Sequence, residues 1–347
     1  MQARGMPNGS NVTVIKADKE IVLAAGGLHS PQILQRSGIG PAPLLHQANI
    51  SVIVDLPGVG NMKNVWPNPD GADSNATFVA WEEEEWEHHR RGCSPPNAMN
   101  FIVLTGTSYT GPYSQTFGNT AALIPLKVLT PRTWEDTVKA YENQNVSSYL
   151  PSSYTKEQIR GYKKQRALLA ESFKHNDNAV IELPFNALSG FDLVLIKPVS
   201  RGTILLDPAN KYAEPILNYH SFANPVDASN VLNSIKFTRR YHAESKTMVE
   251  TFNATELLPG PAISNDAELD AYIRKSTHSS IGHLSGTCAL TPRKLGGVVG
   301  VDLLVYGVTG LSVVDASIMP LIPGAHTCAT VYAVAEKAAD LIKSRHM

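Results

Sequence analysis

Residues 26–40, GGLHSPQILQRSGIG, constrain the fold more than any other stretch of this chain. Residues 11–27 before them predict two short strands, because they are rich in β-branched residues and end in a double glycine. Ser30 and Pro31 have the pattern of a helix start, since serine is a favoured cap and proline costs no hydrogen bond in the first turn. The closing Gly-Ile-Gly is typical of a turn. The stretch therefore predicts strands, a short helix that begins at Ser30, and a turn.

The rest of the chain alternates between helical and extended patterns. The spacing of apolar residues predicts a helix capped by Asn265 at 266–276 and further helices at 133–144, 155–173, 225–248 and 326–344. β-branched runs predict three successive, antiparallel strands at 179–186, 191–200 and 202–207. Residues 61–119 are mostly loop-like, and their charge run WEEEEWEHHRR at 81–91 favours a solvated face or a mobile lid over a cation site.

Composition sets broad limits on function. The chain has 347 residues, 43% hydrophobic and 18% charged, which is ordinary for a globular protein of about two domains. A net charge of −1 gives no global field that would favour nucleic acid. No apolar run reaches the roughly 20 residues of a membrane span. We therefore expect a small-molecule substrate, no nucleic acid and no membrane span; the sequence leaves the oligomeric state open.

Cysteines and glycosylation sequons leave the compartment open. Three cysteines, Cys93, Cys288 and Cys328, are too few for a disulfide framework. We interpret these cysteines as small buried residues and not as nucleophiles. Six sequons suggest a secreted glycoprotein, at Asn8, Asn11, Asn49, Asn75, Asn145 and Asn253. The N-terminal residues MQARGMPNGS contain no signal peptide. Secretory and cytosolic locations both remain open.

Two histidines stand out from the small residues around them. His283 opens HLSGTCAL, and His326 lies in PGAHTCATVY, so that their spacing is 326 − 283 = 43 residues. His278 is close to the first of them, and we interpret it as an ordinary loop histidine.

These motifs resemble the glucose–methanol–choline (GMC) flavin oxidoreductases, in particular the members similar to glucose oxidase and aryl-alcohol oxidase. Residues 26–40 resemble the family's second signature, with Gly27 where the family has Ala, Pro, Ser or Thr. Further segments follow in family order, namely VDLPGVGNMKN, KPVSRGTILL, HLSGTCAL, GVTGLSVVDASIMP and HTCATVYAVAEKAADLI. The likeness extends over nearly the whole chain and is weakest between 61 and 178.

The resemblance implies a mixed α+β and α/β fold. It implies a substrate-binding domain at 61–279, built on an antiparallel sheet backed by helices, and a remnant of the FAD-binding domain at 1–60 and 280–347. It also implies that His283 and His326 form a histidine pair that faces the flavin, with Asp315 near the cofactor.

The family's dinucleotide fingerprint, Gly-x-Gly-x-x-Gly opening a helix, is absent from the sequence. Gly38-Ile39-Gly40 and Gly58-Val59-Gly60 each lack the third glycine and the helix. Gly300 stands where the family has an acid, and Leu304 and Ser312 stand where it has arginines. Two explanations compete: a shortened member that works without FAD, or the C-terminal part of a flavoenzyme whose other half lies elsewhere.

We expect an FAD-independent enzyme as the first hypothesis. Without flavin, two imidazoles in one pocket can act as acid and base at neutral pH, because histidine titrates near pH 6.5. Such a lyase or cyclase would dehydrate or cyclise, possibly pericyclically, a small apolar secondary metabolite. His283 and His326 would be catalytic, with supporting roles for Ser285, Thr287, Ser279 or Ser280, and for His29.

Two alternatives stay open. In the first, the chain is the C-terminal part of an FAD-dependent alcohol oxidase or dehydrogenase, in which Asp315 helps to hold FAD. In the second, it is a non-catalytic binding subunit. A hydrolase is disfavoured, because no Gly-x-Ser-x-Gly elbow is present, and no metal site is expected.

Overall fold

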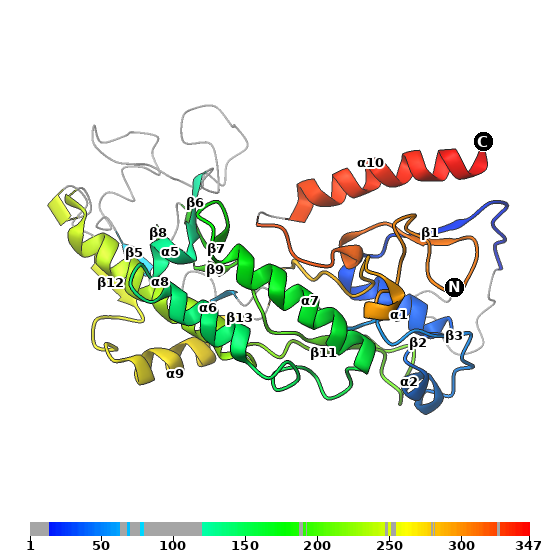
Figure 1. The fold of residues 1–347 in the computed structure, drawn as a ribbon, viewed down its shortest axis with the longest axis horizontal. Coiled ribbons are helices and arrows are strands. Elements are labelled where there is room, and N and C mark those ends of the chain that lie inside the picture. Colours follow the sequence, from blue (N-terminus) through cyan, green and yellow to red (C-terminus); the bar gives the residue numbers. More distant parts are fainter. Residues whose placement is uncertain are drawn as a thin grey trace, which may run out of the picture.

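The computed structural model describes residues 14–62, 68–69, 77–79, 120–186, 190–191, 193–246, 249–250, 255–278, 280, 282–324 and 327–347. The charge run at 81–91 with His88 and His89, Cys93, and the sequons Asn8, Asn11, Asn75 and Asn253 lie outside these residues. Asn49 and Asn145 are exposed. Figure 1 shows helices and strands mixed along the chain, in agreement with the predicted fold class.

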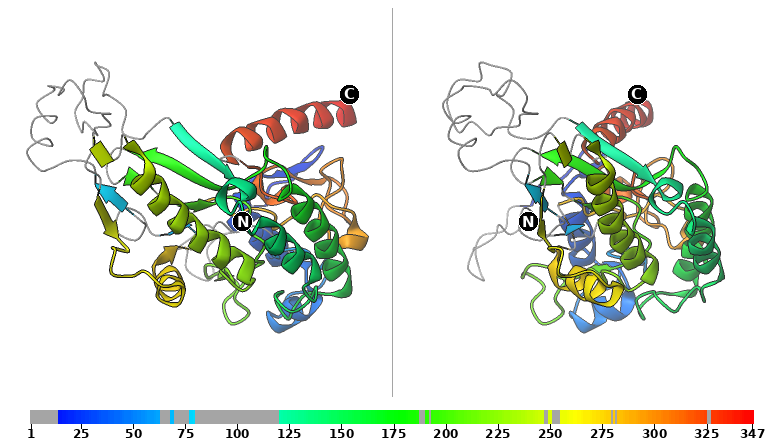
Figure 2. Two further views of the ribbon diagram at one scale, coloured as in Figure 1. Left: turned by 60° about the vertical axis from the view of Figure 1, so that its left-hand side comes forward. Right: turned by 90° about the vertical axis from the view of Figure 1, so that its left-hand side faces the viewer.

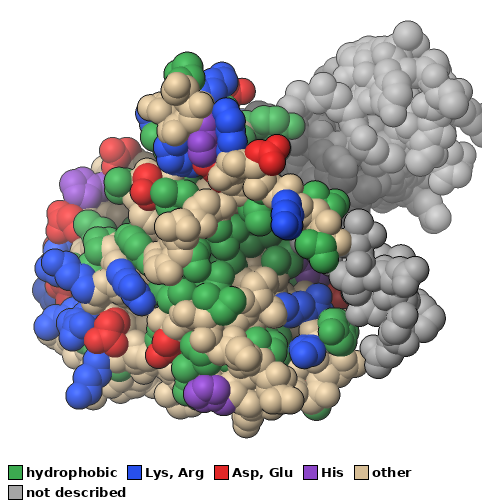
Figure 3. Space-filling view, turned by 90° about the vertical axis from the view of Figure 1, so that its right-hand side faces the viewer, with side chains coloured by type: hydrophobic (Ala, Val, Ile, Leu, Met, Phe, Trp, Pro, Cys, Tyr) green, Lys and Arg blue, Asp and Glu red, His purple; other side chains and the backbone are tan. Residues whose placement is uncertain are grey.

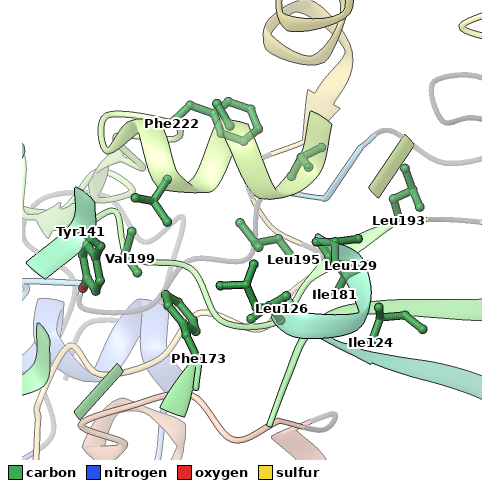
Figure 4. Close-up of a cluster of buried hydrophobic side chains, with 14 of the residues drawn as sticks. Ile124, Leu126, Leu129, Tyr141, Phe173, Ile181, Leu193, Leu195, Val199 and Phe222 are labelled. Carbon is green, nitrogen blue, oxygen red and sulfur yellow. The ribbon is translucent and has the colours of Figure 1, made fainter. Parts of the chain in front are cut away.

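An antiparallel sheet organises the first of two main cores. Its central strand β7 (Ala179–Asn186) pairs with β6 (Thr120–Pro125), β8 (Gly190–Phe191) and β9 (Val194–Leu195). Helices α5 (Leu126–Leu129) and α8 (Pro225–Glu244) pack against its strands, while α6 (Trp134–Asn143) packs against α5, α7 (Lys156–Ser172) against α6, and α9 (Asp266–Ser276) against α8. Buried side chains between Ile124 and Ile273 form what we call the first core (Figure 4). Phe173 and Tyr141 pack together within it, with ring centroids 6.0 Å apart.

Local signals in the sequence set the helix starts around this core. Thr155 and Gln158 form a reciprocal capping box at the start of α7, with the Thr155 backbone N–H 2.6 Å from the Gln158 Oε1. Asn265 caps α9 as predicted, because its Oδ1 accepts a hydrogen bond from the Glu268 N–H at 3.0 Å. Helix α8 ends at Glu244, four residues before the predicted end.

Parallel strand pairs organise the second core. β1 (Ile21–Leu23) runs parallel to β14 (Leu311–Val313), and β2 (Ile39–Gly40) runs parallel to β3 (Val54–Asp55). Around them lie α1 (Gly26–Arg36), α2 (Ala42–Gln47), the 3₁₀ helices η2 (Arg293–Leu295) and η3 (Ala316–Ile318), and the C-terminal α10 (Thr327–His346). The second core consists of buried residues from Leu23 to Val59 and from Cys288 to Ala338. The two ends of the chain therefore fold together.

The surface around β1 and α10 is open. Figures 1 and 2 show α10 running along the outside of the molecule, and its buried residues are Thr327 and Ala338. Ile21 and Val22 of β1 are 56% and 44% exposed. Figure 3 shows hydrophobic side chains gathering in a hollowed area of the face that carries this end of the molecule.

The structure corrects three expectations about elements. Helix α1 begins at Gly26 rather than Ser30, because the Gly26 N–H is already capped by the Asp315 carboxylate from a distant segment. Residues 14–16 are not a strand. β10 (Thr203–Leu205) does not join the sheet of β7 and pairs instead with β11 (Ile216–Asn218).

The remaining strands form two small antiparallel pairs. β5 (Thr77–Val79) pairs with β12 (Thr255–Leu258), and β4 (Asn68–Pro69) pairs with β13 (Thr277–His278). Among the described residues, no helix is both long and apolar enough to cross a bilayer.

Candidate active site

Backbone hydrogen bonds hold the segment that follows His283 against η3. The Gly286 N–H donates to the Ala316 carbonyl at 3.2 Å, and the Cys288 N–H donates to the Ser317 carbonyl at 2.8 Å. His283 itself is half-buried at the start of this segment. The chain leaves η3 through residues 319–324, and the next residues lead to His326 and α10. In the sequence, His283 comes before this unit and His326 comes after it; His326 lies outside the described residues.

A close contact with α1 fixes the same segment from the other side. The Thr287 hydroxyl donates to the Gly27 carbonyl at 2.8 Å. A Cβ added at Gly27 would lie 2.1 Å from the Leu284 carbonyl oxygen, which no side chain could tolerate without movement. The departure at Gly27 from the family pattern thus has a physical reason, because only glycine fits beside the residue that follows His283.

Asp315 joins these pieces. Its carboxylate accepts hydrogen bonds from the Gly26 N–H at 3.0 Å, the Ser30 hydroxyl at 2.5 Å and the Ser317 N–H at 2.7 Å. Negative charge at the start of α1 also suits the helix dipole. Asp315 is therefore the cap that ties β14 to α1.

The site lies at the carboxyl ends of two parallel strands. β1 leads into α1 at Gly26, and β14 leads into Asp315 and η3. In α/β sheets, ligands bind outside the carboxyl ends of the strands. His283 lies directly before the segment that contacts Gly27 on one side and Ser317 on the other.

The polar groups at this edge fit only part of a flavin site. The N–H of Gly26 is bonded to Asp315, and the N–H of Ala25 is bonded to the Ser30 hydroxyl at 3.0 Å. The first turn of α1 thus offers neither of these donors to a pyrophosphate. The described residues at this edge therefore do not by themselves fit the dinucleotide end of a flavin site.

The other predicted residues differ in what they can contact. Ser285 and Thr287 are fully buried, and the Ser285 Oγ has no hydrogen-bond partner among the described residues. The Ser280 hydroxyl accepts from the Gly282 N–H at 3.2 Å in an exposed turn. The half-buried His29 has its Nδ1 3.3 Å from the Gln32 Oε1. Ser279 and the side chain of His278 lie outside the described residues.

Cysteine and metal chemistry receive no support from the described residues. Cys288 is fully buried in the second core, whereas Cys328 is exposed in the first turn of α10. The described ranges contain no group of three or more His, Cys, Asp and Glu side chains that could hold a metal ion.

Sequence reasoning missed a charged cluster that fixes the far end of α10. The Glu20 carboxylate accepts hydrogen bonds from Arg345, from the Ser312 hydroxyl at 2.8 Å and from the His346 Nε2 at 2.7 Å. The Arg345 hydrogen bonds outweigh the opposing effect of burial and lower the pKa of Glu20 to about 2. The guanidinium of this cluster comes from Arg345, 33 positions after Ser312 in the sequence. Nothing near these residues in the sequence indicates a contact over 325 positions.

Lys197 is a second residue that sequence reasoning missed. It lies between the buried residues Ile196 and Pro198, and its Nζ is 3.5 Å from the carbonyl of Ile322 in the segment that leads to His326. Its position directly before the Pro-Val-Ser-Arg-Gly motif is the one signal that could have drawn attention to it.

Comparisons with known proteins agree on one family. Two family models, both described as GMC oxidoreductase, match residues 198–335 and 3–64. The dehydrogenase xptC of Emericella nidulans is 29% identical over 355 residues, which cover 97% of this chain and 54% of that protein. The chain spans about half the length of the curated relatives it matches.

Two solved structures share the fold at higher identity. An FAD-dependent oxidoreductase from Chaetomium thermophilum matches with a TM-score of 0.85 at 30% identity, over 97% of this chain and 57% of that chain. A fungal aryl-alcohol oxidase matches with a TM-score of 0.79 at 34% identity, over 94% of this chain and 55% of that chain.

Proposed function

The chain belongs to the GMC oxidoreductase family, and from that premise we propose that it supplies the substrate side of an FAD-dependent alcohol oxidoreductase. The observation that carries this proposal is the position of His283 at the carboxyl edge of the β1–β14 pair, where ligands bind in α/β folds. The relatives of this chain and the position of His283 both support FAD-dependent alcohol oxidation. In this proposal, the dinucleotide end of the cofactor site comes from polypeptide that completes the parallel sheet.

His283 is the proposed proton acceptor. When bound, the flavin would take the hydride from the alcohol carbon. His283 would accept the hydroxyl proton, since imidazole titrates near neutral pH and a positioned general base contributes about 10²–10⁴-fold. Thr287 and Gly27 hold the backbone that carries His283, so they are positioning residues. His326 is proposed as the partner histidine.

A cofactor-free enzyme is the second candidate, and one observation favours it. The Asp315 carboxylate is committed to three donors of the chain itself, and the first turn of α1 is bonded in the same way. In a chain whose polar groups at this edge are already bonded to one another, His283 and His326 would act as acid and base in the dehydration or cyclisation of a small apolar substrate. In that case the proton steps would need no electron acceptor.

Visible spectra distinguish the two candidates. The 347-residue chain would be purified alone, with added FAD, and after co-expression with the N-terminal half of the fungal aryl-alcohol oxidase that it resembles. We expect flavin bands only in the completed protein, together with benzyl alcohol oxidation coupled to the dye dichlorophenolindophenol. His283→Ala should lower turnover by about 10²–10⁴-fold and leave the bands unchanged.

The exposed His175 provides the matched control, and His175→Ala should leave turnover unchanged. Unaltered turnover in His283→Ala would remove that residue from the mechanism. A colourless chain that converts a substrate with loss of water, or with no change of mass, would replace the first candidate by the second.

A further inference from the structure

Lys197 extends from a backbone segment that several buried hydrogen bonds hold in place. The Asp227 carboxylate accepts hydrogen bonds from the N–H groups of Val199 and Ser200, at 2.8 and 2.7 Å. The fully buried Arg201 donates to the carbonyls of Pro198 and Ser200. The Cα of Lys197 is therefore fixed just outside the first core.

The amine of Lys197 reaches the segment that leads to His326. Its Nζ lies 3.5 Å from the Ile322 carbonyl, which is the outer limit of a hydrogen bond. A Cβ added at Gly324 would lie 3.7 Å from the Lys197 Cε and 3.8 Å from the Nζ. Gly324 stands two residues before His326 in the sequence, and the amine lies beside this described end of the segment.

No described carboxylate compensates this half-buried charge. The Ile322 carbonyl can satisfy one of the three N–H donors of an ammonium group. Burial alone lowers the pKa of Lys197, with no contribution from a neighbouring charged group. Buried charges are costly unless they are paired, so an ammonium in this position is best stabilised by an anion.

We propose that Lys197 recognises a carboxylate on the substrate, so that the site takes small carboxylate-bearing molecules. The two remaining N–H donors of Lys197 would bind the anion beside residues 322–324. This inference rests on the active-site position of the proposed function and not on its redox chemistry. The substrate class that it names depends on Lys197 and not on His283 or His326.

Binding of benzoate and benzyl alcohol to the 347-residue chain tests the proposal without flavin or turnover. These two probes have the same ring and differ in charge. We expect calorimetry to show that benzoate binds more tightly, and that Lys197→Met weakens benzoate binding by about ten- to hundredfold while benzyl alcohol binding stays unchanged. Lys197→Arg should retain most of the preference, because it keeps the charge.

Two further measurements keep the test decisive if Lys197→Met folds poorly. Gly324→Val would cover the amine without removing its charge, and it should weaken benzoate binding. In the unaltered chain, benzoate affinity should fall as the pH rises from about 7.5 to 10.5, because the lysine loses its proton in this range. The matched control is Lys127→Met, which removes a half-buried lysine that lies over Trp134 in the first core region.

The proposal is overturned if the unaltered chain binds benzoate no better than benzyl alcohol. It is also overturned if Lys197→Met and Gly324→Val bind benzoate as the unaltered chain does. Failure of alcohol oxidation in the completed protein would contradict the proposed function and leave the benzoate result standing, so the two ideas fail separately.

Discussion

The two cores of this chain differ in how completely they are enclosed. The first core has a sheet with helices packed around it, and Phe173 and Tyr141 within it are fully buried. The second core leaves Ile21 and Val22 of a parallel pair half-exposed, and Tyr332 on the neighbouring α10 is 71% exposed. Parallel strands are normally covered on both faces. Among the described residues, the first region is therefore the more enclosed one, and the second leaves side chains of a parallel pair exposed.

Core truncations should give the largest effects and should separate the two regions. Phe173→Ala should lower the free energy of unfolding of the first core by about 3–5 kcal/mol, because a buried ring is lost and a cavity remains. Leu34→Ala in the second core is the matched variant, with an expected loss of about 2–4 kcal/mol. Hydrogen exchange should show lost protection in β6 and β7 for the first variant and in α1 for the second. Equal loss throughout both regions would show that they unfold as one unit.

Removing the Asp315 carboxylate should weaken the second core by about 2–4 kcal/mol, because it leaves the Gly26 and Ser317 N–H groups without their acceptor. Urea unfolding of Asp315→Ala measures the loss. Asp207→Ala is the control, since Asp207 makes a similar bond to the Ala209 N–H in an exposed turn. Similar losses in the two variants would contradict a tie between β14 and α1.

A methyl group at Gly27 should disturb the segment of His283. Gly27→Ala places its Cβ against the Leu284 carbonyl and should cost about 1–3 kcal/mol. Gly324→Ala meets only ordinary contacts and should change stability by no more than about 0.5 kcal/mol. Urea unfolding measures both, and the histidine signals in NMR should shift for the first variant alone. A silent Gly27→Ala would mean that this contact does not position His283.

Acid should loosen α10 before it affects the first core. The pKa of Glu20 is lowered to about 2, so its stabilising contribution is complete above the ordinary value near 4.5 and is lost as the pH falls toward 2. We expect a loss on the order of 1–2 kcal/mol in this pH range, seen as faster hydrogen exchange in α10. Glu20→Gln should remove this pH dependence. The exposed pair of Lys139 and Glu135 supplies the control, because Glu135→Gln should have almost no effect.

Local signals made much of the first region predictable. The caps at Thr155 and Asn265 act on donors within three residues, so the sequence contains both partners. The strand at 179–186 was predicted from its own β-branched residues. The start of α1 was predicted wrongly, since Ser30 has the pattern of a cap and yet lies inside the helix. Its true capping group, Asp315, is 289 residues away from Gly26.

The sequence by itself determined the family, the mixed fold class, most helices and the identity of the histidine candidates, because these depend on short motifs and periodic patterns. Only the tertiary structure decided that Gly27 must be glycine, that β10 leaves the sheet of β7, and that Lys197 lies beside Gly324. Each of these facts depends on how closely two distant backbones approach. Such distances follow from packing over the whole chain, and no local pattern of residues encodes them.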